Sequence, residues 1–301
     1  MGILESMLRF VGLSTERRTR PGAPGHRTTD EDGDGDLRVE LPWPIRAERP
    51  GDLGSLGALG LPPGRIVRPD EDETADPVLW LADSVADHRA TWAALAARFP
   101  QTGLWPVLVQ GLGEDLERPW YGGELDGPQG PVPDVAEVLQ ERWSEAVEVL
   151  EEYDEDELDD DQRRVRDAGP VLALAPAQPV GATVQLELGA GTSGLALVPV
   201  GRPADVPSAI GWWGTANVDL DGSDVAAVLR SWEDRFGATL VAMGFDTIHL
   251  EVAAPPSSSN DVATLILEHY AFCPDNIDQG VGSLPAYAPV VRAHHWTFWW
   301  D

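Results

Sequence analysis

The spacing of apolar residues along the chain predicts alternating helices and strands from about residue 77 to the C-terminus. Between 86 and 99, for example, Trp92, Leu95 and Phe99 lie on one helical face, and Pro100 ends the helix. The other predicted helices cover residues 134–152, 203–210, 224–236, 261–272 and 284–292. Apolar or alternating runs predict strands at 104–109, 171–174, 183–188, 195–200, 239–243, 247–252 and 295–300.

The order of these elements favours an α+β fold. In the C-terminal part, strands come in adjacent pairs with helices between the pairs, which is typical of a mostly antiparallel sheet with helices packed on one face. A smaller α/β half is expected before this part, and a flexible N-terminal region before both.

The first 76 residues differ in composition from the rest of the chain. Glycine and proline fill 17 of the 56 positions from 21 to 76, which is typical of irregular or linker sequence. Short extended pieces are still expected at 37–43 and 64–68. Residues 3–11 place apolar side chains on one helical face, but the stretch is too short and too charged to span a bilayer and lacks the pattern of a secretory signal.

The chain is strongly acidic. It carries 51 acidic residues, 21 arginines and no lysine among its 301 residues, for a formal net charge of −30. A protein that binds nucleic acid or an anionic membrane needs a basic face, so we expect no nucleic-acid partner and no stable membrane insertion. The acidity is concentrated, since residues 145–161 alone hold 11 acids and no arginine.

These shifts in composition divide the chain into four predicted parts. They are a short helix with a segment rich in proline, glycine and acids (1–76), an α/β half (77–152), an acidic linker (153–169) and an α+β domain (170–301). Repulsion among the carboxylates is expected to keep the linker solvated.

The residues best suited to chemistry lie in the last hairpin and in the helix after it. His249 and Glu251 share one face of a strand, and His269 and Cys273 lie four residues apart on the helix. All four together would make an acceptable set of zinc ligands if the two faces met. The alternative is a hairpin with one polar face and a small buried cysteine.

Cys273 is the single cysteine of the chain. This excludes an internal disulfide and fits a reducing, cytoplasmic compartment. Its thiol could act as a nucleophile beside His249 or His269, with Glu251 or Asp275 orienting the histidine. The sequence contains no complete catalytic constellation, and no cofactor is expected.

Two acidic loops resemble calcium sites. Asp30, Asp32 and Asp34 occupy the first, third and fifth positions of an EF-hand-like loop, but its twelfth position is Leu41 instead of a glutamate. Residues 217–222 repeat the pattern with the same defect. A solvated acidic linker and an ordinary helix cap explain the two loops without calcium.

Three residues are candidate contacts for a partner. Trp232 and Arg235 stand among acids at the end of a helix, where an arginine is usually held in a structural ion pair but can also orient a carboxylate ligand. Trp299 lies on the opposite face of the last strand from Trp296, so one of these two side chains is expected to be more exposed.

Several motifs in the C-terminal part resemble a known family. They are R-P-A-D-V-P (202–207), G-W-W-G (211–214), L-R-S-W-E-D-R-F-G-A (229–238), G-F-D-T-I-H-L-E-V-A-A-P-P (244–256), E-H-Y-A-F-C-P-D (268–275) and W-T-F-W-W-D (296–301). From Leu195 to Asp301 the chain resembles the bacterial family catalogued as domain of unknown function 4253. The resemblance implies a bacterial, actinobacterial-type soluble protein and carries over no catalytic residue.

The sequence therefore favours a non-enzymatic protein-interaction module whose acidic surface binds a basic protein, as inhibitors and immunity proteins do. The alternative is an enzyme or metal-binding domain that uses the His, Glu and Cys cluster. A regulatory module held at a membrane by residues 2–13 is a third interpretation. The sequence does not predict the oligomeric state.

Overall fold

The computed structural model describes residues 37–69, 74–83, 85–113, 115–188 and 194–301. Its strands are β1 (Leu37–Pro42), β2 (Arg65–Val67), β3 (Leu79–Ala82), β4 (Leu104–Val109), β5 (Thr183–Leu188), β6 (Gly194–Pro199), β7 (Ala238–Met243), β8 (Thr247–Val252) and β9 (His295–Trp299). Its α-helices are α2 (His88–Ala96), α3 (Phe99–Thr102), α4 (Val135–Glu151), α5 (Asp160–Asp167), α6 (Val206–Ile210), α7 (Gly222–Phe236), α8 (Ser259–Phe272) and α9 (Ala288–Val291). Shorter helical turns are η1 (Leu53–Ala58), η3 (Glu117–Tyr121), η4 (Pro203–Asp205), η5 (Ala216–Val218), η6 (Asn276–Val281) and η7 (Pro285–Tyr287).

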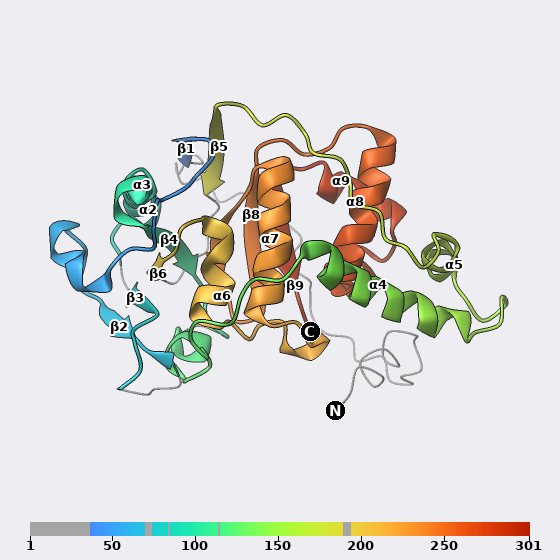
Figure 1. Cartoon of the computed structure of the whole chain (residues 1–301), viewed down its shortest axis with the longest axis horizontal. Helices are drawn as coiled ribbons and strands as arrows, with labels where there is room; N and C mark the ends of the chain where they lie inside the picture. The colour runs from blue at the N-terminus through green and yellow to red at the C-terminus, as the bar shows by residue number, and fades with distance from the viewer. Residues whose placement is uncertain (1–36, 70–73, 84, 114, 189–193) are drawn as a thin grey trace.

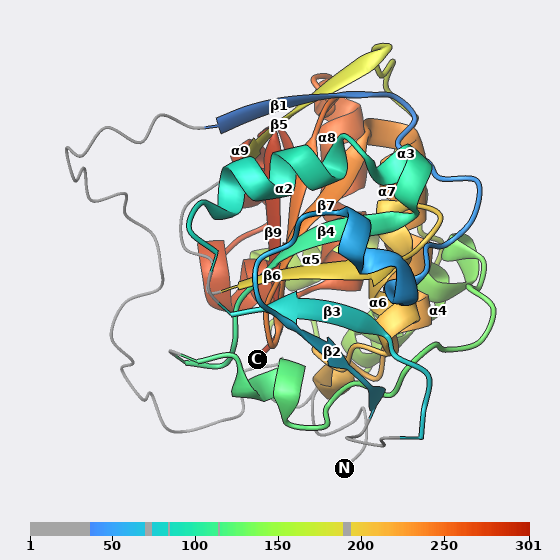
Figure 2. The same cartoon turned by 90° about the vertical axis from the view of Figure 1, so that its left-hand side faces the viewer.

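Seven strands form one sheet in the order β2-β3-β6-β4-β7-β8-β9 (Figures 1 and 2). Within the described residues, neighbouring strands are antiparallel except β4 and β7, which run parallel. β1 and β5 form a separate two-stranded ribbon, although they lie far apart in the sequence. This mixed, mostly antiparallel sheet with its helices confirms the predicted α+β class.

The predicted α/β half contributes to the same sheet as the predicted C-terminal domain. β6 lies between β3 and β4, and β4 in turn lies beside β7. The parallel pairing joins Leu108 to Ala242 and Val109 to Met243. The predicted boundaries between parts stay predictions, but strands from both sides of the acidic segment share one sheet and one core.

Helix α7 shows how local sequence sets the limits of an element. The Asp221 side chain accepts hydrogen bonds from the backbone N–H groups of Ser223 and Asp224 and so caps the first turn. Gly237 ends the helix with φ 65°, a left-handed conformation that glycine adopts without strain. The sequence predicts this helix over 224–236, so its end is confirmed and its start lies two residues earlier, at Gly222.

Helices α7 and α8 cover one face of the β8 and β9 strands. Trp232 of α7 stacks on Phe298 of β9, with ring centroids 5.0 Å apart, and lies edge-on to Trp296 at 5.8 Å. Phe272 of α8 lies edge-on to Phe298 at 5.3 Å. Helix α4 lies across α7 and α8 (Figure 1). Among the described helices, none is both long enough and apolar enough to cross a membrane.

Two local predictions differ from the structure. Residues 171–174 are not a strand, because the Gln140 side chain donates to the Pro170 carbonyl and accepts from the Leu172 N–H, so these backbone groups are taken by a side chain. Pro100 does not end the preceding helix; it lies in the first turn of α3, where a proline is tolerated.

The segment predicted as an acidic linker contains α5. The Asp159 side chain caps this helix, and Leu158 and Val165 are buried in the core, with 2% and 1% of their surfaces exposed. Arg163, Arg164 and Arg166 form ion pairs with carboxylates of the same segment. The segment is therefore packed on the protein, with most of its carboxylates on the outside.

Candidate functional site

The residues of the predicted zinc set do not share one face of the sheet: His249 and Glu251 lie on one face, His269 packs on the other, and Cys273 lies at the edge beside β9. On β8, His249 and Glu251 point away from the face that holds Ile248 and Leu250, which pair with Phe298 and Trp296 of β9. His269 of α8 packs on that second face, with ring centroids 4.7 Å from Trp296 and 4.9 Å from Phe298.

The structure therefore does not bring the four predicted ligands together. Among the described residues, no group of three or more His, Cys, Asp or Glu side chains is arranged to hold a metal ion. Helical and strand periodicity had shown which residues share a face of their own element, but not which face of the sheet the helix covers.

His269 is a buried histidine in an aromatic environment. It has no exposed surface and packs on Trp232, with ring centroids 4.6 Å apart. Its Nδ1 lies 3.3 Å from the Tyr287 hydroxyl, whereas its Nε2 has no hydrogen-bond partner among the described residues. Burial, and then the positive charge of Arg235, hold the pKa of His269 well below its usual value of 6.5. The imidazole is therefore neutral at pH 7.

Cys273 has a structural position at the free edge of the sheet. Its Sγ donates a hydrogen bond to the Trp299 carbonyl at 3.0 Å. Next to it, the Asn276 side chain donates to the Thr297 carbonyl at 2.7 Å and accepts from the Trp299 N–H at 3.2 Å. These two side chains satisfy the outward backbone groups of the edge strand β9 and block the addition of another strand. Burial raises the pKa of the Cys273 thiol far above its usual range, so it is not a ready nucleophile.

A different set of polar residues meets on the face of β8 and β9 opposite α7 and α8. The Nδ1 of His295 lies 2.7 Å from Oε1 of Glu251, and its Nε2 lies 3.0 Å from Oγ1 of Thr297. The same Thr297 oxygen lies 3.1 Å from Nδ1 of His249. The two imidazole rings are stacked, with centroids 5.6 Å apart. We call Glu251, His295, Thr297 and His249 the polar chain.

Hydrogen-bond chemistry fixes the direction of the polar chain when both histidines are neutral. The Glu251 carboxylate can only accept, so Nδ1 of His295 carries the proton and Nε2 is a free base. The Thr297 hydroxyl then donates to Nε2 of His295 and accepts from Nδ1 of His249. Burial, and then the neighbouring His295, lower the pKa of His249 to about 4, which keeps His249 neutral at pH 7.

The polar chain combines predicted and unpredicted residues. His249 and Glu251 were candidates from the sequence, whereas His295 and Thr297 were not. The signal that could have found them is the alternation on the last strand, because residues 295 and 297 share a face with Trp299 and pair with residues 251 and 249 of β8. The chain is open to solvent at His295, whose side chain is 47% exposed, while the Glu251 side chain is only 4% exposed.

Trp232 and Arg235 are not on the surface in the way that a partner contact requires. Trp232 is fully buried, and Arg235 donates two hydrogen bonds to the buried carboxylate of Glu268 on α8. Sequence reasoning placed Arg235 among its neighbours Glu233 and Asp234, but those two acids pair with arginines from other parts of the chain, Arg46 and Arg202.

The tryptophan that the protein exposes most clearly was not among the candidates. Trp299 is half-buried, whereas Trp213 of the G-W-W-G motif has 54% of its surface exposed. Its neighbour Trp212 is fully buried, with its indole N–H donating to the Gly244 carbonyl at 3.0 Å. Helical or strand periodicity could not separate the two, because they lie in a turn.

The predicted calcium loops have different outcomes. Asp30, Asp32 and Asp34 lie outside the described residues. In the second loop, the Asp221 carboxylate accepts backbone hydrogen bonds as the cap of α7. The second loop is thus accounted for as a helix cap.

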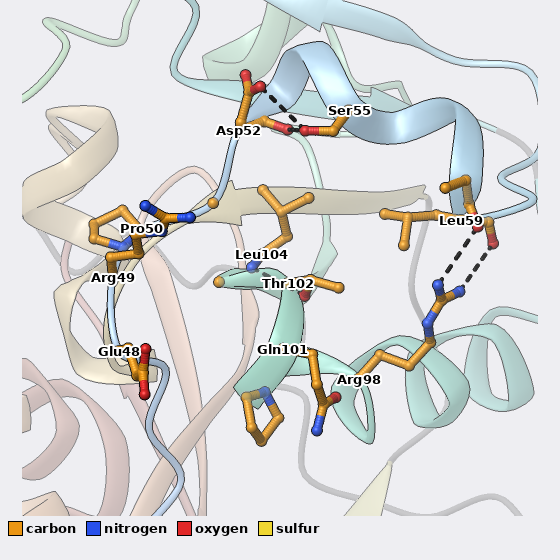
Figure 3. Close-up of a pocket in the computed structure, with 14 residues that line it drawn as sticks. Glu48, Arg49, Pro50, Asp52, Ser55, Leu59, Arg98, Gln101, Thr102 and Leu104 are labelled. Atoms are coloured by element: carbon orange, nitrogen blue, oxygen red, sulfur yellow. Dashed lines mark hydrogen bonds between the residues drawn. The ribbon is translucent and has the colours of Figure 1, made fainter.

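A cavity of about 700 Å³ lies in the upstream part of the protein, lined by residues 48–52, 55, 58–59, 98 and 100–104 (Figure 3). The Asp52 side chain accepts a hydrogen bond from the Gly54 N–H and so caps η1. The Arg98 guanidinium points to the Leu59 and Ala58 carbonyls, at 3.5 and 3.4 Å. These groups serve the local fold, and none of the candidate residues from the sequence lines the cavity.

Comparison with known proteins covers the C-terminal part of the chain. Residues 194–301 match the family model described as Domain of unknown function (DUF4253). The match begins at the first residue of β6 and includes β7, β8, β9 and the helices between them, so it supports the resemblance carried by the C-terminal motifs. No curated protein and no solved structure matches the chain.

Proposed function

We propose that the protein is an interaction module that binds a basic partner protein through an acidic surface at the end of α4. We define the acidic surface by six exposed carboxylates: Glu148, Glu151, Glu152, Asp154, Asp156 and Glu157. Figure 1 shows this end of α4 and the turn that leads to α5 at the right-hand edge of the molecule.

The observation that carries the proposal is the lack of compensation at this surface. None of the six carboxylates takes part in an ion pair with another described residue. The three arginines of α5 are occupied by Glu155, Asp160, Asp161 and Asp167. Like charges held this close repel one another, so a basic partner would gain both attraction and relief of that repulsion.

The packing of α5 supports a preformed binding surface. Leu158 and Val165 are buried on either side of the Asp159 cap, which fixes the turn that bears the carboxylates. A surface that is ordered before binding loses less conformational entropy when the partner binds. We infer a role like that of inhibitors or immunity proteins that neutralise cationic proteins, in the cytoplasm of a bacterial, actinobacterial-type host.

The test is affinity capture from such a host with the whole chain as bait. Wild type is compared with a variant in which the six carboxylates are changed to their amides. The matched control changes six exposed acids elsewhere: Glu40, Glu48, Asp76, Glu117, Asp126 and Glu137. We expect a basic protein that is retained by wild type and by the control, is lost with the variant, and elutes as salt rises. Recovery of neutral partners only, or equal capture by all three baits, would contradict the proposal.

One observation favours a second candidate function, that of an enzyme. The polar chain connects a hydroxyl, an imidazole and a buried carboxylate in sequence, which is the connectivity of a general-base site. This candidate uses Glu251 and His249 of the predicted cluster without His269 or Cys273.

A further inference from the structure

Two imidazole nitrogens lie within hydrogen-bond distance of the Thr297 hydroxyl oxygen. His295 Nε2 is 3.0 Å away and His249 Nδ1 is 3.1 Å away. Thr297 is half-buried on the edge strand β9. The paired contacts fix both the direction of the Thr297 O–H bond and the position of its oxygen.

The imidazole of His295 is held in one tautomer. Its Nδ1 lies 2.7 Å from Oε1 of Glu251, whose side chain is only 4% exposed. A buried carboxylate accepting from Nδ1 leaves Nε2 free to accept a proton and stabilises the imidazolium that results. The order carboxylate, imidazole, hydroxyl is complete in these three residues.

We propose that Thr297 is a nucleophile that accepts an acyl group from an ester, with His295 as its general base and Glu251 as the residue that positions His295. This proposal develops the enzyme candidate and is independent of the acidic surface. It names the substrate class as carboxylic esters with a neutral or cationic acyl group, because the chain carries a net charge of −30 and disfavours the approach of anions.

The reaction balances within these residues and the substrate. Nε2 of His295 takes the hydroxyl proton of Thr297 as Oγ1 attacks the ester carbonyl carbon. The C–O bond to the alcohol then breaks, and the imidazolium returns the proton to the leaving oxygen, so that an alcohol departs and an acyl-threonine ester remains. Water, deprotonated by the same Nε2, then attacks the acyl carbon. The bond from that carbon to Oγ1 breaks, the imidazolium returns its proton to Oγ1, and the carboxylic acid is released, which restores Thr297 and His295.

His249 is a positioning residue in this scheme. Because its Nδ1–H donates to the Thr297 oxygen, the hydroxyl hydrogen must point to His295. Burial lowers the pKa of His249 to about 4, so this donor is neutral at pH 7.

The experiment treats the full-length protein with a fluorophosphonate probe, which forms a covalent bond with activated hydroxyls, and maps the adduct by peptide mass spectrometry. We expect one adduct per chain, on Thr297. Thr297→Val should abolish it, Thr297→Ser should retain it, and Glu251→Gln or His295→Gln should slow labelling by at least about 100-fold. Thr247→Val is the matched control, since Thr247 lies on the same face of β8 and should have no effect on labelling.

The same variants separate chemistry from folding. Circular dichroism and melting temperature identify any variant that has lost its fold, and Thr297→Val keeps the shape and the strand preference of threonine. The hydrolysis of p-nitrophenyl acetate should show a burst of one equivalent in wild type and none in Thr297→Val. Labelling at another residue, or equal labelling of wild type and folded Thr297→Val, would overturn the proposal.

Discussion

Arg235 donates two parallel hydrogen bonds to the carboxylate of Glu268, from Nη1 to Oε1 at 2.9 Å and from Nη2 to Oε2 at 2.6 Å. Glu268 has no exposed surface. It also accepts from the Trp232 indole at 3.1 Å and from the Ala175 N–H at 2.6 Å. The pair thus joins α7, α8 and the segment before β5 through one fully bonded buried carboxylate.

Removal of one partner should therefore be costly. Arg235→Met leaves the Glu268 charge buried without its counter-ion, and we expect the free energy of unfolding to fall by about 3–5 kcal/mol. The control is Arg164→Met, which breaks an ion pair on the surface with Asp161 and should cost about 1 kcal/mol or less. Urea unfolding followed by tryptophan fluorescence measures both. A similar loss of unfolding free energy in the two variants would show that the buried pair contributes no more to stability than the surface pair.

The buried His269 should make the protein sensitive to acid. In the unfolded chain this imidazole binds a proton near pH 6.5, whereas burial keeps its pKa much lower in the folded state. Below pH 6.5 the unfolded state therefore binds more protons, and the free energy of unfolding falls as pH decreases, by up to about 1.4 kcal/mol per pH unit.

His269→Phe tests this contribution, because it keeps an aromatic ring among Trp232 and Trp296 but cannot titrate. We expect the slope of unfolding free energy against pH, between pH 6.5 and 5, to decrease by about one proton relative to wild type. His294→Gln, a change at an exposed histidine, is the control substitution. A slope that stays the same in His269→Phe would mean that His269 is protonated in the folded protein.

Asn276 should protect the edge of the sheet. Its amide occupies the Thr297 carbonyl and the Trp299 N–H. In Asn276→Ala these groups lose their partner, so we expect faster hydrogen exchange at the Trp299 amide and more aggregation on concentration. Gln279→Ala is the control, since the Gln279 amide donates to the Asp275 side chain in the same turn and does not contact β9 backbone groups among the described residues. Unchanged exchange at Trp299 would show that other groups cover the edge.

Cys273 should be inert in the folded protein. Its thiol is fully buried, donates to the Trp299 carbonyl, and has a pKa that burial raises well above its usual range. Ellman's reagent at pH 8 should therefore release no colour from the native chain and one equivalent after unfolding in urea. Rapid reaction in the native state would reinstate Cys273 as a candidate nucleophile.

Local sequence signals predicted many elements well. The apolar run 104–109 is β4, α7 ends at Phe236 as predicted, and the hairpin of β7 and β8 was expected. These elements depend on contacts between near neighbours in the chain, such as the Asp221 cap. Alternation on β8 also placed His249 and Glu251 on one face correctly.

Pairing between distant segments could not be predicted in the same way. Nothing in the local pattern indicates that β4 lies beside β7, or that β1 pairs with β5. The predicted zinc set was not brought together for a related reason, because the periodicity of α8 does not reveal which face of the sheet this helix covers. His269 was thus grouped with His249, although the sheet separates them, and His295 was missed.

The most direct test of the proposed function is the dependence on salt of the affinity between the protein and the basic partner that it captures. We expect the affinity of wild type to fall steeply between 50 and 300 mM salt, because the Debye length shortens by a factor of about 2.5 over this range. The variant with six amides in place of the carboxylates of the acidic surface should bind at least about tenfold more weakly at low salt, with a flatter dependence. Equal affinity and equal salt dependence for wild type and this variant would show that the partner does not bind at the acidic surface.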